Sequence, residues 1–235
     1  MSNRCAGFTG WHRSRSIIKT AIFFSQMKAG IIAIIEDLLL RAIDSRNATK
    51  DLAAKCQRNC IVDPGFPILW FGDLDAYLDT PKEQRALTIG VNPSGQELRR
   101  NRLGSYIHFP DIDTESDSIE VKDYIKALNG YFSIKPLKWF EKGMEKVLYK
   151  YSDGSLIHID CCSTIATKPT WTGLCDHMRE HLKRENEIVF EKLLRNLMPS
   201  KIYIASNTME KEYIEKRCRE LLNHDDTPIL FIQKY

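Results

Sequence analysis

Three short apolar runs of the sequence are each followed by polar residues whose types do chemistry. The amide Asn92 follows RALTIGV, the carboxylate Asp160 follows LIHI, and Ser206, Asn207 and Thr208 follow KIYIA. Side chains of these kinds position water, form hydrogen bonds and transfer protons. Such runs are typical of buried strands, and the carboxyl ends of parallel strands meet at one edge of a sheet, where ligands bind. We therefore expect these three segments to form one rim that holds a ligand.

The elements that must position this rim alternate between strands and helices. We expect strands at residues 67–73, 85–91, 156–166, 201–205 and 228–232, and helices at residues 28–45, 51–59, 136–149, 176–197 and 209–223. Ser94 and Glu97 have the spacing of an S-x-x-E capping box, so we expect a further helix to begin at Ser94. The alternation predicts a three-layer α/β/α domain with a central, mainly parallel four-stranded sheet.

The N-terminal part has a helical pattern without strands. We expect residues 1–62 to form an N-terminal extension and helical segment and residues 63–235 to form the α/β domain. Charged residues interrupt the apolar stretch 17–40, so that no run reaches the ~20 apolar residues of a membrane span. No small-residue cleavage site follows this stretch, which argues against a signal peptide. We expect a cytoplasmic protein that does not bind membranes.

Composition limits the class of protein. Hydrophobic residues make up 43% and charged residues 28% of the 235 residues, which is globular composition and excludes wholesale disorder. The 34 Lys and Arg residues against 31 Asp and Glu residues exclude a strongly basic, histone-like DNA binder, but they allow a local basic groove. No glycine-rich phosphate loop is present, which argues against an ordinary P-loop or dinucleotide-binding enzyme.

The seven cysteines are irregularly spaced and include no paired CxxC motif, which favours free thiols in a reducing compartment. Cys56 and Cys60 lie one helical turn apart and could hold an iron–sulfur cluster with a more distant cysteine. His158, Asp160 and Cys162 share one face of their strand and could ligate a metal ion. Neither spacing requires a metal, so we expect no metal site and no cofactor.

Two segments resemble motifs of a known family. LTIGVNPS at residues 87–94 resembles motif one of the uracil-DNA glycosylase superfamily in its G-x-N-P form, which its mismatch-specific and single-strand-selective branches carry. LIHIDCCSTIAT at residues 156–167 resembles the strand from which the family recognises a base flipped out of DNA. The order of motif one, an aromatic-rich excursion, a helix and this strand agrees over about residues 66–235. The resemblance implies a glycosylase-like fold that hydrolyses an N-glycosidic bond in DNA.

The resemblance gives roles to residues of both motifs. Asn92 would orient the attacking water and Asp160 would occupy the base-recognition position, which makes them the candidate catalytic residues. The further base-binding candidates are Gly90, Val91, Pro93, Phe109, Tyr131, Phe132 and His158. The candidates for contact with the DNA backbone are Ser94, Lys168, Ser206, Asn207 and Thr208. A structural role is the alternative for most of them, such as a turn cap for Asn92 and a core position for His158.

Three aromatic residues are candidates to stack on the base. Phe109 lies in the excursion where the family keeps its stacking ring, and Tyr131 and Phe132 are the alternatives. Trp171 follows the base-recognition strand and could shape the pocket or wedge the DNA. His158 would shuttle a proton or pair with Asp160.

The residue type of Asp160 bears on the target base. An Asn at this position suits uracil, whereas an ionised carboxylate only accepts hydrogen bonds and matches the exocyclic amine of cytosine. We therefore expect a modified cytosine as the target, in a setting such as defence against phage with modified DNA. No lysine stands at an obvious nucleophile position, which predicts a monofunctional enzyme without a lyase step.

One departure from the family's pattern leaves alternatives open. The second motif, a His-Pro-Ser type loop after the last strand, has no counterpart in the sequence. The alternatives are a non-catalytic DNA-binding member of the same fold and an enzyme that acts on free nucleosides or nucleotides. We expect DNA as the partner and a monomeric protein.

Overall fold

The computed structural model describes residues 10–112, 119–134, 136–144, 147–206, 210–222 and 226–232, with only the backbone of residues 10–29, 141–143 and 148. The chain divides into two compact units, Met1–Asp37 and Leu38–Tyr235. One helix, α1 (Gly10–Cys56), replaces the two N-terminal helices that the sequence predicted and continues through the division. Within the described ranges, no helix is both long and apolar enough to cross a membrane.

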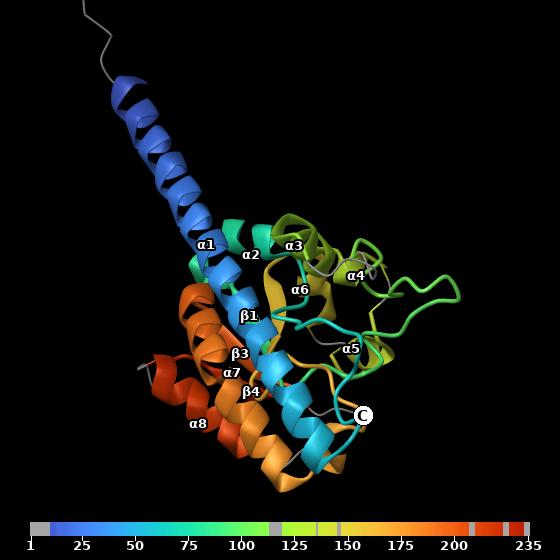
Figure 1. Ribbon diagram of the computed structural model, residues 1–235. Coiled ribbons are helices and arrows are strands. Elements are labelled where there is room, and N and C mark those ends of the chain that lie inside the picture. Colours follow the sequence, from blue (N-terminus) through green and yellow to red (C-terminus); the bar gives the residue numbers. More distant parts are fainter. Residues whose placement is uncertain are drawn as a thin grey trace, which may run out of the picture. The chain divides into compact units, whose positions relative to one another are not determined.

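A four-stranded sheet forms the centre of the second unit (Figure 1). Its strands are β1 (Ala86–Gly90), β2 (Leu156–Asp160), β3 (Lys201–Ile204) and β4 (Ile229–Phe231), in the order β2-β1-β3-β4. All three pairings are parallel, and Gly90 at the end of β1 lies opposite Asp160 at the end of β2. Every residue of β1 and of the edge strand β2 is buried, as expected for parallel strands covered on both faces.

Helices cover both faces of this sheet, which confirms the three-layer α/β/α class. The helical elements are α2 (Leu74–Asp79), η1 (Lys82–Gln84), α3 (Val121–Asn129), α4 (Tyr131–Ile134), α5 (Lys138–Gly143), α6 (Leu148–Ser152), η2 (Trp171–Gly173), α7 (Asp176–Leu197) and α8 (Glu210–Leu222). The chain moves from β1 to β2 in one direction along the sheet and from β2 to β3 and β4 in the other. Right-handed crossovers therefore put α3–α6 on one face and α7 and α8 on the opposite face.

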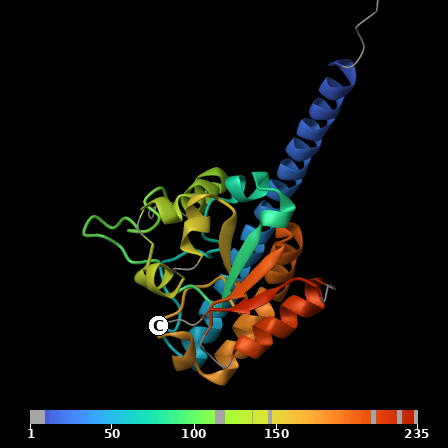
Figure 2. The ribbon, with the colours of Figure 1, turned by 180° about the vertical axis from the view of Figure 1, so that it is seen from behind.

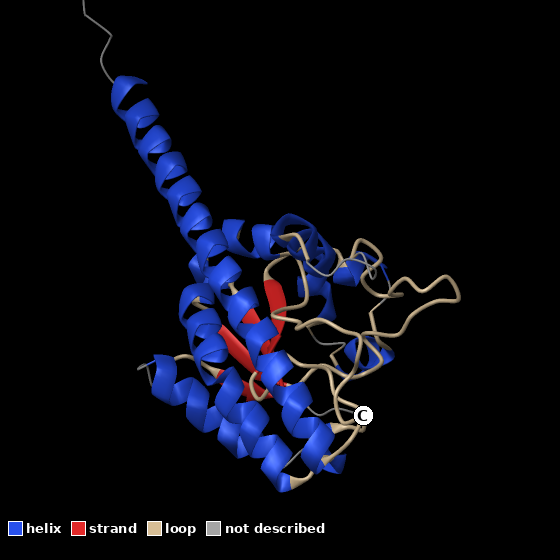
Figure 3. Ribbon diagram, viewed as in Figure 1, coloured by secondary structure: helices blue, strands red, loops and turns tan. Residues whose placement is uncertain are grey.

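The figures follow this arrangement. In Figure 2 the strands β1, β3 and β4 lie in front of α7 and α8. Figure 3 shows the same strands among the helices that cover them. Helices α7 and α8 contact each other, α8 contacts β3, and α2 and α6 contact β2.

Several expected elements differ from the structure. Residues 67–73 are extended but lie outside the sheet, with one isolated antiparallel bridge from Phe71 to His158. The strand expected over residues 156–166 ends at Asp160, although the apolar burial continues beyond it. No helix begins at Ser94, and the Glu97 carboxylate accepts a hydrogen bond from the Tyr131 hydroxyl. The helix expected over residues 136–149 is replaced by α5 and α6.

An aromatic cluster fills the space between the sheet and the segments of the long excursion. Phe109 packs edge to face against Phe66 and tilted against Phe71, and the rings of Phe71 and Phe109 have centroids 4.8 and 5.5 Å from that of Tyr131. These rings are buried and bring the excursion back onto the carboxyl end of β1. The cluster therefore fixes the loops at the edge where ligands of parallel sheets bind.

Candidate active site

A pocket of about 220 Å³ opens at the carboxyl ends of β1 and β2. Its lining residues come from the loops after the two strands, from α5 and from the segment before α2: Phe71, Val91, Asn92, Pro93, Ser94, Glu97, Trp139, Asp160, Thr167, Thr170, Trp171 and Thr172. Asn92 and Asp160, which are 68 positions apart in the sequence, thus face one space. The volume is below the ~300 Å³ of the smallest pockets for drug-sized ligands, so the pocket suits a single base ring better than a whole nucleotide.

A larger hollow lies at the opposite edge of the sheet. It measures about 950 Å³ and is lined among others by Thr80, Glu83, Ser155 and Lys201, at the amino ends of the strands. Size alone would favour this hollow, but it is on the wrong edge for a ligand site of a parallel sheet. The smaller pocket is the candidate site because buried polar groups converge on it.

Asp160 is held tightly at the end of β2. Asp160 is 4% exposed. Asn186 of α7 anchors the backbone at this position, because its Nδ2 donates hydrogen bonds to the carbonyl oxygens of Cys161 (2.9 Å) and Asp160 (3.3 Å). A Cβ atom at Gly90 would overlap Oδ1 of Asp160 and lie 2.9 Å from Nε2 of His158. The glycine of the motif is therefore required by the close approach of the Asp160 carboxylate.

A chain of buried polar groups lies behind Asp160. His158 Nε2 is 3.4 Å from Asp160 Oδ1, and His158 Nδ1 is 2.8 Å from the Thr88 hydroxyl. That hydroxyl is 2.5 Å from the hydroxyl of Tyr151. Burial raises the pKa of the Tyr151 phenol far above its ordinary value, so the phenol stays protonated. His158 is thus a buried core residue that does not line the pocket but lies next to Asp160. Its position is compatible with a core role and with pairing to Asp160.

Asn92 has a fixed amide orientation. Its Nδ2 donates to the carbonyl oxygen of Pro93 and to Oγ1 of Thr167, both at 2.8 Å. A carbonyl oxygen only accepts, so the nitrogen must be the atom that faces Pro93. Both amide hydrogens are then used, and Oδ1 has no hydrogen bond to the described part of the chain. Asn92 can therefore accept a hydrogen from a water molecule and orient it.

The aromatic walls of the pocket include Trp171, which the sequence singled out, but none of the three rings expected to stack on the base. Phe109 and Tyr131 are completely buried in the aromatic cluster, and Phe132 packs against Tyr151 with a centroid distance of 4.0 Å. None of these three lines the pocket. Phe71 and Trp139 line it instead, with Trp139 half-buried and stacked on Phe140. Sequence reasoning assigned both to ordinary secondary structure, and no local signal distinguished them from the other rings.

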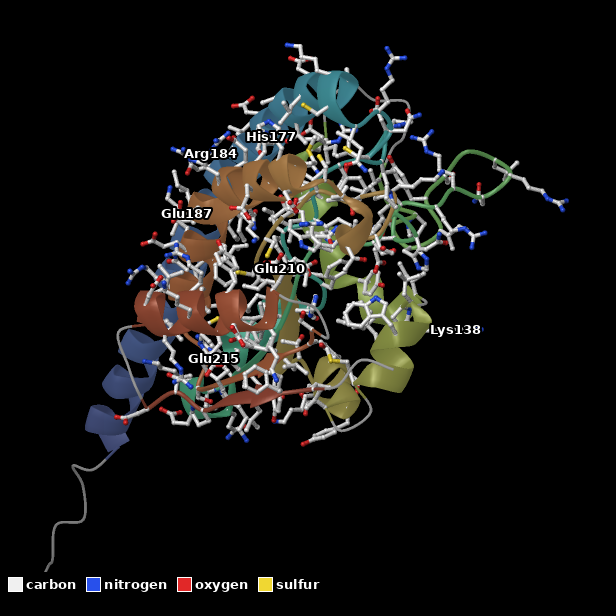
Figure 4. All side chains as sticks on the ribbon, turned by 90° about the horizontal axis from the view of Figure 1, so that it is seen from below. Lys138, His177, Arg184, Glu187, Glu210 and Glu215 are labelled. Atoms are coloured by element: carbon white, nitrogen blue, oxygen red, sulfur yellow. The ribbon has the colours of Figure 1, made fainter. Side chains whose placement is uncertain are left out.

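Trp171 lines the pocket and is braced from behind by a buried ion pair. Its Nε1 donates to Oε1 of Glu210 (3.1 Å), whose Oε2 is 2.8 Å from Nζ of Lys183. Glu210 is 3% exposed, and Figure 4 shows it inside the molecule, whereas Arg184 and Glu187 of α7 lie on its outer side. The first residue of α8 therefore helps to fix one wall of the pocket.

The candidates for contact with the DNA backbone occupy different positions. Ser94 lines the pocket, and its hydroxyl accepts a hydrogen bond from the Gln96 amide at 3.2 Å. Lys168 is exposed and directly follows Thr167 of the lining, while Ser206 is buried at the end of β3. The other two candidates, Asn207 and Thr208, lie outside the described residues. Arg99, Arg100 and Arg102, which lie close together in the sequence, are exposed.

The thiols of the described residues are all free: Cys56, Cys60, Cys161, Cys162, Cys175 and Cys218. Burial raises the pKa of the Cys60, Cys161 and Cys218 thiols above the ordinary value. Across the ranges that the structure describes, no three His, Cys, Asp or Glu side chains are grouped as metal ligands. The iron–sulfur and metal alternatives therefore gain no support from the described geometry.

We compared the sequence with protein-family models and with curated proteins. No protein-family model matches the chain, and no curated protein matches it. Function must therefore be argued from the pocket and from the two motifs that line it.

Proposed function

We propose that the protein is a monofunctional DNA glycosylase that hydrolyses the N-glycosidic bond of a base flipped out of DNA. The observation that supports this most is the shared pocket of Asn92 and Asp160, which is of single-base size and lies at the carboxyl ends of adjacent strands. The resemblance of residues 87–94 and 156–167 to the uracil-DNA glycosylase motifs supports the same activity. Phe71, Trp139 and Trp171 line this pocket, and aromatic side chains are the residue type that stacks on bases.

The reaction follows from the hydrogen bonds of Asn92. Its amide oxygen accepts a hydrogen from a water molecule, which orients the water oxygen toward C1′ of the flipped nucleotide. Cleavage of the glycosidic bond sends its electron pair to the base and gives the sugar oxocarbenium character, and the water then bonds to C1′. Of the described residues that line the pocket, none is a lysine, so a Schiff base to the sugar is not expected.

The target base follows from Asp160. Its carboxylate is fixed between Gly90 and His158 and accepts hydrogen bonds when ionised, which matches the exocyclic amine of cytosine. We therefore assign a modified cytosine as the preferred base, with defence against phage DNA as one setting. Free buried thiols are compatible with a reducing, cytoplasmic location.

A panel of labelled oligonucleotides tests the proposal. Single- and double-stranded substrates would contain uracil, cytosine, 5-hydroxymethylcytosine or its glucosylated form, and alkali would cut the abasic products. We expect wild type to release one cytosine derivative and Asn92→Ala to lose about 10²–10³-fold in single-turnover rate, as for removal of one preorganised polar group.

The same panel separates the alternatives. Asp160→Asn should transfer activity toward uracil, because the amide can both donate and accept. Release of uracil alone by wild type would keep the reaction and overturn the base assignment. DNA binding without release of any base would favour a non-catalytic binding protein, and release from free nucleosides alone would favour a nucleoside hydrolase.

A further inference from the structure

Glu97 is a buried carboxylate that lines the candidate pocket. It is 1% exposed and belongs to the loop that also contains Asn92. Burial of a carboxylate is unfavourable unless hydrogen bonds compensate for the lost hydration. A structural role as a helix cap does not explain it, because the expected helix at Ser94 does not form. Because Glu97 lines the pocket, we look for a role of its carboxylate in the pocket.

The hydroxyl of Tyr131 holds this carboxylate in place. Tyr131 OH donates to Oε2 of Glu97 at 2.6 Å and accepts a hydrogen bond from the Leu137 amide at 3.1 Å. Burial, together with the neighbouring Glu97 carboxylate, raises the pKa of the Tyr131 phenol far above its ordinary value. The phenol therefore keeps its proton and acts only as a donor to Glu97. A hydrogen bond of this kind favours the ionised carboxylate and fixes its rotamer.

The loop itself fixes Glu97 relative to Asn92. The Glu97 amide donates to the Ser94 carbonyl at 3.0 Å, and the Asn92 side chain is bonded to Pro93 and Thr167. The Gly95 amide donates to the Thr167 carbonyl at 3.1 Å, which joins this loop to the loop after β2. Both functional side chains are thus presented by one short segment with defined hydrogen bonds.

The proposed hydrolysis needs a proton acceptor that Asn92 cannot provide. A water that donates one hydrogen to Asn92 Oδ1 must lose its other hydrogen as the bond to C1′ forms, and a neutral amide is not a base. Of the described residues that line the pocket, Asp160 and Glu97 are the two carboxylates. Asp160 lies beside Gly90 and His158 at the base-recognition position, which leaves Glu97 for the water.

We infer that Glu97 is the general base of the reaction: its carboxylate takes the second proton of the water that Asn92 orients. This inference rests on the proposed function. The water oxygen bonds to C1′, the C1′–N bond breaks with its electron pair going to the base, and the water proton moves to Glu97. The products are the abasic sugar, the departing base anion and a protonated Glu97, which then returns its proton to the base or to solvent.

The test compares substitutions on one substrate. Glu97→Gln keeps an oxygen that can accept from Tyr131 but removes the base, so the single-turnover rate should fall about 10²–10⁴-fold. Oligonucleotide affinity, measured by fluorescence anisotropy, should change less than about 3-fold, because the proton transfer contributes to the transition state and not to binding. Gln96→Ala is the matched control, since Gln96 is exposed in the same loop and does not line the pocket. Thermal unfolding establishes that each variant is folded.

The pH profile distinguishes a base from a structural residue. Ionisable groups near Glu97 are Tyr131, which bonds to it, Asp160 across the pocket, and His108, whose ring centroid lies 6.1 Å from that of Tyr131. For wild type we expect the rate to fall at low pH as Glu97 becomes protonated, and this acidic limb should be absent from the residual activity of Glu97→Gln. Tyr131→Phe removes a bond to the ionised form, so the limb should move to higher pH.

Each outcome decides between the two proposals. If Glu97→Gln retains a rate within about 3-fold of wild type while Asn92→Ala is inactive, this inference fails and the glycosylase function stands. An acidic limb that persists in Glu97→Gln, or that Tyr131→Phe does not move, also overturns it and points to Asp160. If Glu97→Gln does not fold, the pH–rate profile of Tyr131→Phe alone decides whether Glu97 is the general base. Absence of base release by wild type on every oligonucleotide would refute the function and the inference together.

Discussion

The two ends of the sheet differ in how their polar groups are held. At the carboxyl end, three carboxylates are nearly inaccessible to water and each has a buried neighbour. Glu97 accepts a hydrogen bond from Tyr131, Glu210 accepts one from Trp171, and Asp160 lies 3.4 Å from the ring nitrogen of His158. At the amino end, the larger hollow is lined by charged residues such as Glu83 and Asp153, which are exposed to water. Solvated charges of this kind contribute little to stability or to ligand orientation.

This difference shows that volume is a poor guide to function in this fold. The pocket at the carboxyl end has less than a quarter of the volume of the hollow, about 220 against 950 Å³. Preorganised groups are what favour a transition state, because they do not reorient when charge develops. Substitutions at the carboxyl end should therefore have large effects, and matched substitutions at the amino end should have small ones.

The largest effect on stability is expected at Glu210. Glu210→Ala removes one partner of a buried pair and leaves Lys183 with the exposed Glu180 in place of its buried acceptor, so the free energy of unfolding should fall by about 3–5 kcal/mol. Base release should also weaken, because Trp171 loses the acceptor for its indole nitrogen. Urea denaturation and single-turnover assays measure the two effects.

Glu212→Ala provides the control for that measurement. Glu212 lies on the same helix but is exposed, so its loss should change the free energy of unfolding by less than about 0.5 kcal/mol. Equal effects of the two substitutions would contradict the contrast between braced and solvated carboxylates.

Periodicity alone predicted some of these elements closely. Helix α7 matches the expected range of 176–197, because its buried residues, such as Met178, Leu182 and Val189, recur at helical spacing. The β1, β3 and β4 strands lie within one or two residues of their predicted ends. The convergence of Asn92 and Asp160 was also predictable, since it follows from the strand order and a parallel sheet.

Tertiary contacts determine side-chain roles and strand ends that hydrophobic periodicity does not predict. Glu97 fits a capping box locally, but Tyr131, which is 34 positions away, accounts for its carboxylate. Residues 161–166 stay buried after the backbone has left the strand, so hydrophobicity gave no indication of where β2 ends. The identity of an aromatic residue also does not reveal whether its ring faces a pocket, as Phe71 does, or supports one from behind, as Phe109 does.

A smaller effect is expected at Gly90. In Gly90→Ala the new methyl group would overlap Asp160 Oδ1, and the resulting overpacking should lower the free energy of unfolding by about 1–3 kcal/mol. Release of the preferred base should fall together with base discrimination, because Asp160 must move away from its fixed position. The substrate panel and urea denaturation measure both.

The control for Gly90 is Gly130→Ala. A Cβ atom at Gly130 would lie 3.4 Å from its nearest neighbour, the Lys126 carbonyl oxygen, which is ordinary van der Waals contact. This variant should retain activity and stability. A Gly90→Ala protein with unchanged base discrimination would show that the close approach of the Asp160 carboxylate has no functional meaning.

The smallest effect is expected from Glu83→Gln at the amino end of the sheet. It is the same chemical change as Glu97→Gln, but Glu83 is exposed at the hollow and should alter the free energy of unfolding by less than about 0.5 kcal/mol. Base release should equal that of wild type over the whole pH range, because no reacting group is near. If Glu83→Gln instead slowed release as much as Glu97→Gln does, the larger hollow would have to take part in binding DNA. A loss of oligonucleotide affinity in Glu83→Gln alone would assign that hollow a binding role and leave the chemistry at the carboxyl end.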